Sequence, residues 1–211
     1  MNKKKLGTGL VALALVGVVG IGGSLAWFTD NDVATNVFTT NHVEINIDET
    51  TTEKENVKEN ENGFTYSHVE PGDSISKNVT VTKAANSEDA WVRLVIKVTG
   101  DKVVAALTDG DTTNDIVFKN GETELNLTWA PVYDDEQKLV AATATYDDDV
   151  SLVGADASWN PFTHVQVPTT WGNYYADATF TVELTAEAVQ YDNNNQGFDA
   201  EGVVVEQYTA Q

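Results

Sequence analysis

The sequence contains no cysteine, one methionine, four prolines and few basic residues. Without cysteine, neither disulfides nor thiolate chemistry can serve the protein, so its stability must come from a hydrophobic core. Only 12 Lys and Arg residues stand against 33 Asp and Glu residues, which gives the 211-residue chain a formal charge of −21. Because nucleic acid phosphates carry charge of the same sign, we exclude nucleic acid as a partner.

The sequence motifs of common enzymes are also missing. There is no His-Glu-x-x-His, which would place two zinc-binding imidazoles on one face of a helix, no Gly-x-Ser-x-Gly and no glycine-rich phosphate loop. The three histidines, His42, His68 and His164, are not at metal-ligand spacing. We therefore predict a protein that is not an enzyme, with no catalytic residue and no cofactor.

The first 26 residues have the pattern of an export signal. Lys3 to Lys5 form a positive start, Leu6 to Gly20 an apolar stretch, and Ser24-Leu25-Ala26 a small-x-small cleavage site. A retained anchor is the alternative, but the stretch Leu10–Gly23 is shorter than the roughly 20 apolar residues that span a bilayer. We expect cleavage between Ala26 and Trp27 and secretion, with a signal peptide at 1–26, an N-terminal segment at 27–40 and one domain at 41–211. The mature chain then keeps nine basic residues against 33 acidic ones, a formal charge of −24.

Alternation of apolar and polar residues predicts strands along the rest of the chain. It is clear at Val43–Ile47, Ile75–Thr82, Ala90–Thr99, Lys138–Tyr146 and Ala178–Val189. About eight strands without a long amphipathic helix indicate an all-β, antiparallel two-sheet sandwich. Periodicity alone leaves a jelly roll and an immunoglobulin-like sandwich open.

Other segments carry local signals. Asn120-Gly121 predicts a hairpin between Ile116–Phe118 and Leu125–Trp129, since both turn residues must take positive φ. The polar run Glu49–Gly63 predicts a mobile loop. Asp101–Leu107 is either a loop or a short helix, and Val203–Tyr208 is a last strand or a short helix.

Clustered carboxylates make calcium the better metal candidate, because hard cations take oxygen ligands. The candidate ligands lie in three clusters, each of which we expect in a loop: Asp109, Asp111 and Asp115; Asp147 and Asp149; and Asp192. The last cluster imitates an EF-hand loop, but its twelfth position is Val203 instead of the bidentate Glu. Aspartates are common in turns for conformational reasons, so these sites are weak candidates.

Five aromatic residues are concentrated between Ser158 and Tyr175, namely Trp159, Phe162, Trp171, Tyr174 and Tyr175. They could form a binding patch for carbohydrate or a partner protein. A loop that covers one end of the core is the favoured interpretation.

Three segments carry a resemblance to a known family. They are the stretch from Gly22 to Asp30 (GGSLAWFTD), the turn and strand from Glu70 to Thr82, and the late strand from Thr181 to Gln190 ending in Ala-Val-Gln. In this order they resemble the TasA/camelysin family of biofilm matrix and spore coat-associated proteins. The resemblance implies a jelly roll and export through a SipW-type signal peptidase.

The resemblance also implies fibre assembly in the extracellular matrix or at the cell surface, where the N-terminal segment of one subunit supplies a strand to the next, with accessory matrix proteins as further partners. Applied to this chain, the apolar anchors of the donor segment would be Trp27, Phe28, Val33, Val37 and Phe38. The camelysin branch implies a secreted metallo-endopeptidase as an alternative, although the zinc motif is missing. A monomeric surface adhesin is a third reading.

Overall fold

The computed structural model describes residues 42–52, 57–60, 63–192, 194, 196–199 and 205–209, all within the unit Asn41–Gln211. These residues form mostly antiparallel strands and one α-helix. The all-β, antiparallel prediction is therefore confirmed. The predicted signal peptide, its cleavage site and the donor segment lie outside the described residues.

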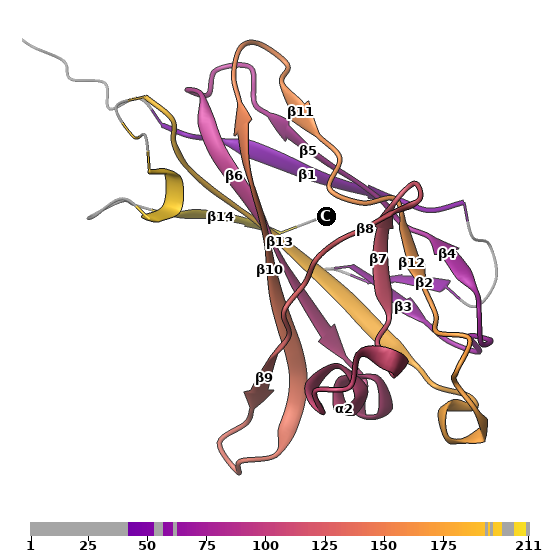
Figure 1. Ribbon diagram of the computed structural model, residues 1–211. Coiled ribbons are helices and arrows are strands. Elements are labelled where there is room, and N and C mark those ends of the chain that lie inside the picture. Colours follow the sequence, from indigo (N-terminus) through magenta and orange to yellow (C-terminus); the bar gives the residue numbers. More distant parts are fainter. Residues whose placement is uncertain are drawn as a thin grey trace, which may run out of the picture. The chain divides into compact units, whose positions relative to one another are not determined.

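Three long strands lie side by side and organise the largest sheet (Figure 1). β6 (Ala90–Thr99) pairs along its length with β13 (Phe180–Gln190) on one side and with β10 (Leu139–Leu152) on the other. The sheet continues from β10 to β9 (Ala130–Tyr133), and from β13 to β3 (Gly63–Tyr66) and β2 (Val57–Asn60). A further strand, β14 (Glu206–Thr209), pairs with β13 beyond β3.

Two smaller sheets complete the strand arrangement. One has the order β1 (Ile45–Thr50), β5 (Asn78–Lys83) and β11 (Ser158–Trp159). The other has the order β4 (Ser74–Ser76), β12 (His164–Gln166), β7 (Val117–Asn120) and β8 (Thr123–Glu124). The N–H groups of Lys77 and Val79 donate to the carbonyl oxygens of Thr163 and Phe162 at 2.9 and 3.1 Å. These bonds continue the pairing from one small sheet into the other.

All three sheets contribute side chains to one hydrophobic core. In β6, Val92, Leu94, Ile96 and Val98 are buried, and their neighbours on the other face are half-buried, as the alternation predicts. The facing residues come from β1, β5, β7 and β12, including Ile45, Val81, Phe118 and Val165. The sheets therefore enclose the core between them.

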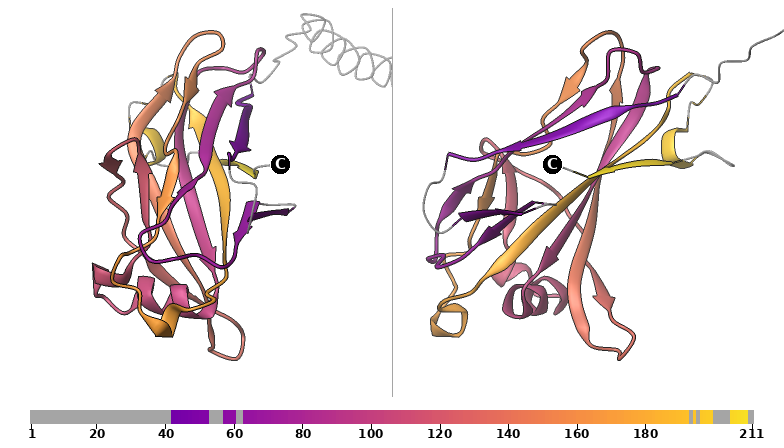
Figure 2. Two further views of the ribbon diagram at one scale, coloured as in Figure 1. Left: turned by 90° about the vertical axis from the view of Figure 1, so that its right-hand side faces the viewer. Right: turned by 180° about the vertical axis from the view of Figure 1, so that it is seen from behind.

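The segment after β6 is the short helix α2 (Asp101–Thr108), which lies at one end of the sheet (Figure 2). Its buried residues Val103, Val104 and Leu107 recur at helical spacing and close that end of the core. Of the two alternatives for this segment, the helix is correct. Among the described residues, no helix is long and apolar enough to cross a membrane.

The predicted hairpin is confirmed, but its turn lies one residue later than expected. Lys119 pairs with Glu124 and Asn120 with Thr123, so Asn120 ends β7 and Gly121-Glu122 form the turn. Of the predicted turn residues, Gly121 has a positive φ of 59° and Asn120 does not. The second strand is shorter than predicted, although the Leu125 N–H still donates to the Phe118 carbonyl at 2.8 Å.

Two local predictions need correction. The expected mobile loop Glu49–Gly63 contains the end of β1 and all of β2, which pairs with β3 as a hairpin. The hairpin forms because β3 joins β13 and because the single apolar residue Val57 packs against the core. The predicted strand Ile75–Thr82 is divided at Lys77 into β4 and β5.

Candidate functional site

The three histidines lie in separate segments. His42 precedes β1 and is exposed, with its Nε2 3.3 Å from the Glu44 carboxylate. His68 is exposed after β3 and has a φ of 54°. His164 begins β12, and its Nδ1 lies 2.8 Å from the Thr163 hydroxyl. Within the described ranges, no group of three or more His, Asp or Glu residues is arranged to hold a metal ion.

The first calcium candidates use their carboxylates in local turns. The Asp111 carboxylate accepts the Thr113 N–H at 3.0 Å and the Thr113 hydroxyl at 2.6 Å, and so caps the short 3-10 helix η2 (Thr112–Asn114). These hydrogen bonds lower the pKa of Asp111. The Asp109 carboxylate accepts the Asp111 N–H at 2.7 Å. Both are therefore accounted for by turn geometry.

Asp115 has a different environment. Burial raises its pKa to about 6, and repulsion from Asp109 and Asp111 adds to the shift. Its Oδ1 is buried and has no hydrogen-bond partner among the described residues. Asp109 and Asp111 thus act electrostatically on Asp115, but among the described residues the three carboxylates do not form a metal-binding group.

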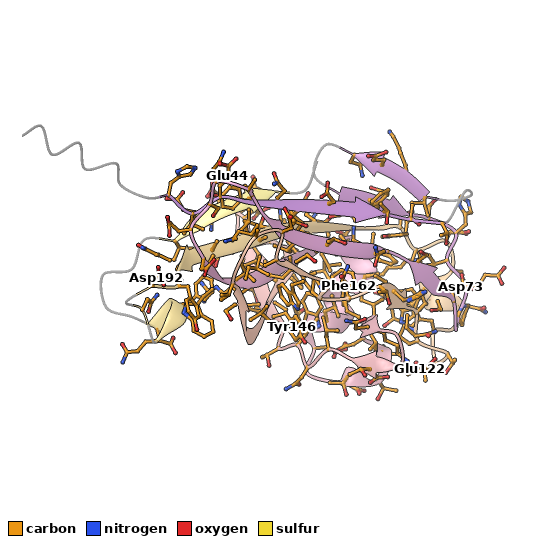
Figure 3. The ribbon with its side chains drawn as sticks, turned by 90° about the horizontal axis from the view of Figure 1, so that it is seen from above. Glu44, Asp73, Glu122, Tyr146, Phe162 and Asp192 are labelled. Carbon is orange, nitrogen blue, oxygen red and sulfur yellow. The ribbon has the colours of Figure 1, made fainter. Side chains whose placement is uncertain are left out.

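The other calcium candidates lie elsewhere. Asp147 and Asp149 were expected in a loop, but they lie within β10, where its register with β6 shifts between Tyr146 and Val150. The loop placement is wrong because a bulge absorbs the acidic residues inside a continuous strand. Asp192 is exposed just after β13, at the opposite end of the described unit from Asp73 in the loop before β4 (Figure 3). Val203, its twelfth position, lies outside the described residues.

The aromatic residues between Ser158 and Tyr175 mostly cover the core. Phe162 is completely buried and Trp171 is 3% exposed, whereas Tyr174 is 64% exposed (Figure 3 labels Phe162). The Trp171 ring stacks on Tyr175 at a centroid distance of 4.5 Å, and the Trp159 ring on Tyr146 at 5.8 Å. Burial of Phe162 and Trp171 contradicts the exposed patch and agrees with a loop that covers the core.

An open strand edge is the best candidate for an assembly surface. Among the described residues, β1 pairs only with β5. Just before β1, the Ala84 N–H donates to the Glu44 carbonyl oxygen at 3.0 Å. In an antiparallel pair every second residue directs its N–H and C=O toward the partner strand, so the residues of β1 at even positions direct theirs toward β5. By this alternation the peptide groups of Ile45 and Ile47 face away from β5, while their side chains are buried.

The sequence reading missed a buried ion pair beside this edge. Lys77 Nζ contacts Glu49 Oε2, and the two side chains are 0% and 2% exposed. The pattern contained a signal for both: Lys77 has the parity of the inward-facing Val79 and Val81, and Glu49 that of Ile45 and Ile47. Strand alternation therefore indicates that both charged side chains point into the core, although it does not indicate that they form a pair.

The comparisons with known proteins add the family. A family model described as camelysin metallo-endopeptidase matches residues 1–195. The chain belongs to the camelysin family. This confirms the TasA/camelysin resemblance. Searches of curated proteins and of solved structures found no match. The camelysin description names a metallo-endopeptidase, but the part of the chain that the structure describes contains no metal-binding group.

Proposed function

We propose that this camelysin family member is a secreted structural protein that assembles into fibres of the extracellular or biofilm matrix. Family membership supports an extracellular role that is structural or peptidase-like. In this proposal, a SipW-type signal peptidase removes residues 1–26, and the segment 27–40 of one subunit adds a strand to the next. The antiparallel sheets around one core are compatible with a jelly roll, which is the topology we propose.

The open edge of β1 carries the proposal. An unpaired edge offers a row of N–H and C=O groups to an incoming strand. The buried side chains of Ile45 and Ile47 beside this edge favour a strand that carries apolar residues. The Tyr208 hydroxyl donates to the Val43 carbonyl oxygen at 2.7 Å, so β14 covers the beginning of this edge. The section from Ile45 onward is the proposed acceptor.

The other strand edges are less suited to this role. β9 contains Pro131, which has no N–H to donate, and β2 has only four residues, with Lys58 and Glu59 exposed. Short, charged or proline-containing edges oppose strand addition. A contact between the donor segment of one subunit and β1 of the next is head-to-tail and does not close, so it propagates into a filament.

Truncation tests this function. We expect the mature chain, Trp27–Gln211, to form filaments in negative-stain electron microscopy and to scatter light increasingly with time. A chain beginning at Asn41 keeps every described strand and should stay folded by circular dichroism but monomeric. Filaments of this truncated chain would reject strand donation by the N-terminal segment.

The family description favours one second function, a secreted metallo-endopeptidase. It predicts casein hydrolysis that stops on addition of a chelator and in variants with alanine at His42, His68 and His164. Inactivity of the purified mature chain, with zinc supplied, would end this alternative.

A further inference from the structure

A lysine and a glutamate meet in the interior beside β1. Lys77 lies between β4 and β5, and Glu49 lies near the end of β1. Their side chains are 0% and 2% exposed, and Nζ is in contact with Oε2 of the carboxyl group. In the described part of the chain, the other Lys or Arg pairs with Glu are Arg93–Glu187, Lys97–Glu183 and Lys119–Glu124, and each keeps at least one side chain more than a quarter exposed.

The surroundings of this pair are aromatic and apolar. The Phe64 ring centroid lies 4.7 Å from Lys77 Nζ, and the neighbouring Tyr66 is completely buried. The second carboxyl oxygen, Glu49 Oε1, is buried and has no hydrogen-bond partner among the residues that the structure describes. A buried ion pair is costly when its remaining lone pairs are unsatisfied, so two full charges are poorly supported here.

Burial shifts both groups toward their neutral forms. Burial raises the pKa of Glu49 and lowers that of Lys77, although each partner's charge acts in the opposite direction. Repulsion from Glu59 raises the pKa of Glu49 further. A neutral amine beside a neutral carboxylic acid is the reactive combination for amide formation, because the free amine has a lone pair and the acid can release water.

We propose that Lys77 and Glu49 form an intramolecular isopeptide bond. Nζ of the neutral lysine attacks Cδ of the protonated glutamic acid, a C–N bond forms, and a C–O bond of the carboxyl group breaks. The hydroxyl leaves with a proton from the nitrogen as one water molecule, so no oxidant or other reactant is needed. The fold supplies what the reaction lacks in solution: a fixed contact between the two groups and a site that excludes water.

The product fits the site better than the ion pair does. The amide carries no charge, so neither a buried ammonium nor a buried carboxylate remains, and Oε1 becomes a single amide oxygen. The bond would attach β1 covalently to the junction of β4 and β5. β1 is the first described strand in the sequence after the N-terminal segment. The bond would therefore fix the strand that follows this segment along the chain.

Mass spectrometry of the denatured mature chain tests the proposal. We expect an intact mass lower than the sequence mass by one water molecule. After trypsin digestion, the peptides that contain Glu49 and Lys77 should stay joined, with no cleavage after Lys77. A chain of full sequence mass, with separate peptides and normal cleavage at Lys77, would overturn the proposal. The measurement is made on denatured monomers, so its outcome does not depend on whether fibres form.

Two variants locate the bond. Lys77→Arg keeps a cation, but its guanidinium is a poor nucleophile, and the variant should recover the full sequence mass. The double variant Lys77→Met with Glu49→Leu leaves no buried charge and serves if the arginine disturbs the fold. Glu183→Gln, at the more exposed Lys97–Glu183 pair, is the control and should keep the loss of one water. Loss of water that persists in both Lys77 variants would assign it to another site and reject this one.

Discussion

The indole N–H of Trp171 donates a hydrogen bond to the backbone carbonyl oxygen of Asn114 at 2.9 Å. This bond ties the aromatic loop to the acidic segment, and the Thr170 hydroxyl adds a second bond to the Thr113 carbonyl at 2.8 Å. The residue that follows Asn114, Asp115, is half-buried, with its Oδ1 shielded from water. Burial also raises the pKa of Tyr175, with Asp109 as the largest electrostatic contribution. The loop and the acidic segment act as one cap on this end of the core.

The first prediction concerns Asp115→Asn. The raised pKa means that the folded state holds the proton more tightly than the unfolded state, so folding stability decreases as pH rises from 3.8 to about 6. At neutral pH the neutral asparagine should therefore stabilise the protein, by roughly 1 kcal/mol after allowance for solvent screening. Urea unfolding at neutral pH and at pH below 3.8 measures this. The gain should disappear at the lower pH.

Asp111→Asn is the matched control, because the pKa of Asp111 is lowered by its hydrogen bonds from Thr113. A lowered pKa means that the ionised carboxylate stabilises the folded state above its ordinary pKa. This variant should therefore not gain stability at neutral pH. Equal gains in both variants would show that general charge reduction, and not the burial of Asp115, is the cause.

Strand alternation predicted most of the core. It assigned the buried side of β6 and the inward residues of β13 correctly, because one face of each strand packs on the core. Alternation also implied that Lys77 is inward, but a charged residue at an inward position is normally an argument against burial. The partner that makes its burial tolerable, Glu49, is 28 positions away, and only the register of β1 with β5 brings the two together.

Tertiary pairing decided the features that the sequence did not reveal. The polar segment around Lys58 has little strand propensity, and it forms β2 because β3 offers a partner. Likewise, Asp147 and Asp149 suggest a loop until β6 continues past them on the neighbouring strand. The exposure of Trp171 could not be judged locally, since its partner Asn114 is 57 positions away. Edge pairing, bulges and loop docking are non-local, and local patterns do not contain them.

The second prediction concerns the ion pair between β6 and β13. Glu187 is 6% exposed, receives a hydrogen bond from Arg93 Nε at 2.7 Å and another from the Gln207 amide at 2.7 Å. Glu187→Ala removes both and should lower the free energy of unfolding by about 1–3 kcal/mol. Glu183→Ala at the more exposed Lys97 pair is the control, with a loss below about 1 kcal/mol. Urea denaturation compares them, and equal losses would contradict the assignment.

The third prediction concerns Gly100, the N-cap residue that precedes α2. Gly100 has a φ of 121°, and a Cβ there would lie 2.5 Å from the Thr179 carbonyl oxygen and 3.0 Å from Phe180 Cα. Gly100→Ala must strain the backbone or displace β13, at a cost of roughly 1–3 kcal/mol or more. Gly121→Ala, at a φ of 59° with open space around it, isolates the cost of positive φ alone. The melting temperature should fall further for Gly100→Ala, and the reverse order would show that crowding at Thr179 is unimportant.

The last prediction separates the donor segment from the folded domain. Of the proposed anchors, Trp27, Val33 and Val37 share one side of an extended strand, and Phe28 and Phe38 share the other. If the side of Val37 is the one that enters the neighbouring subunit, Val37→Asp places a charge where burial without a partner is costly. Asn36→Asp introduces the same charge at the adjacent position, which faces the other side of an extended strand. Val37→Asp should abolish filaments or slow their growth at least about tenfold, as about 1.4 kcal/mol of lost contact implies. Asn36→Asp should assemble nearly normally, and both chains should melt like the wild type as monomers. Equal inhibition by the two variants would attribute the effect to net charge and argue against a strand with one buried face.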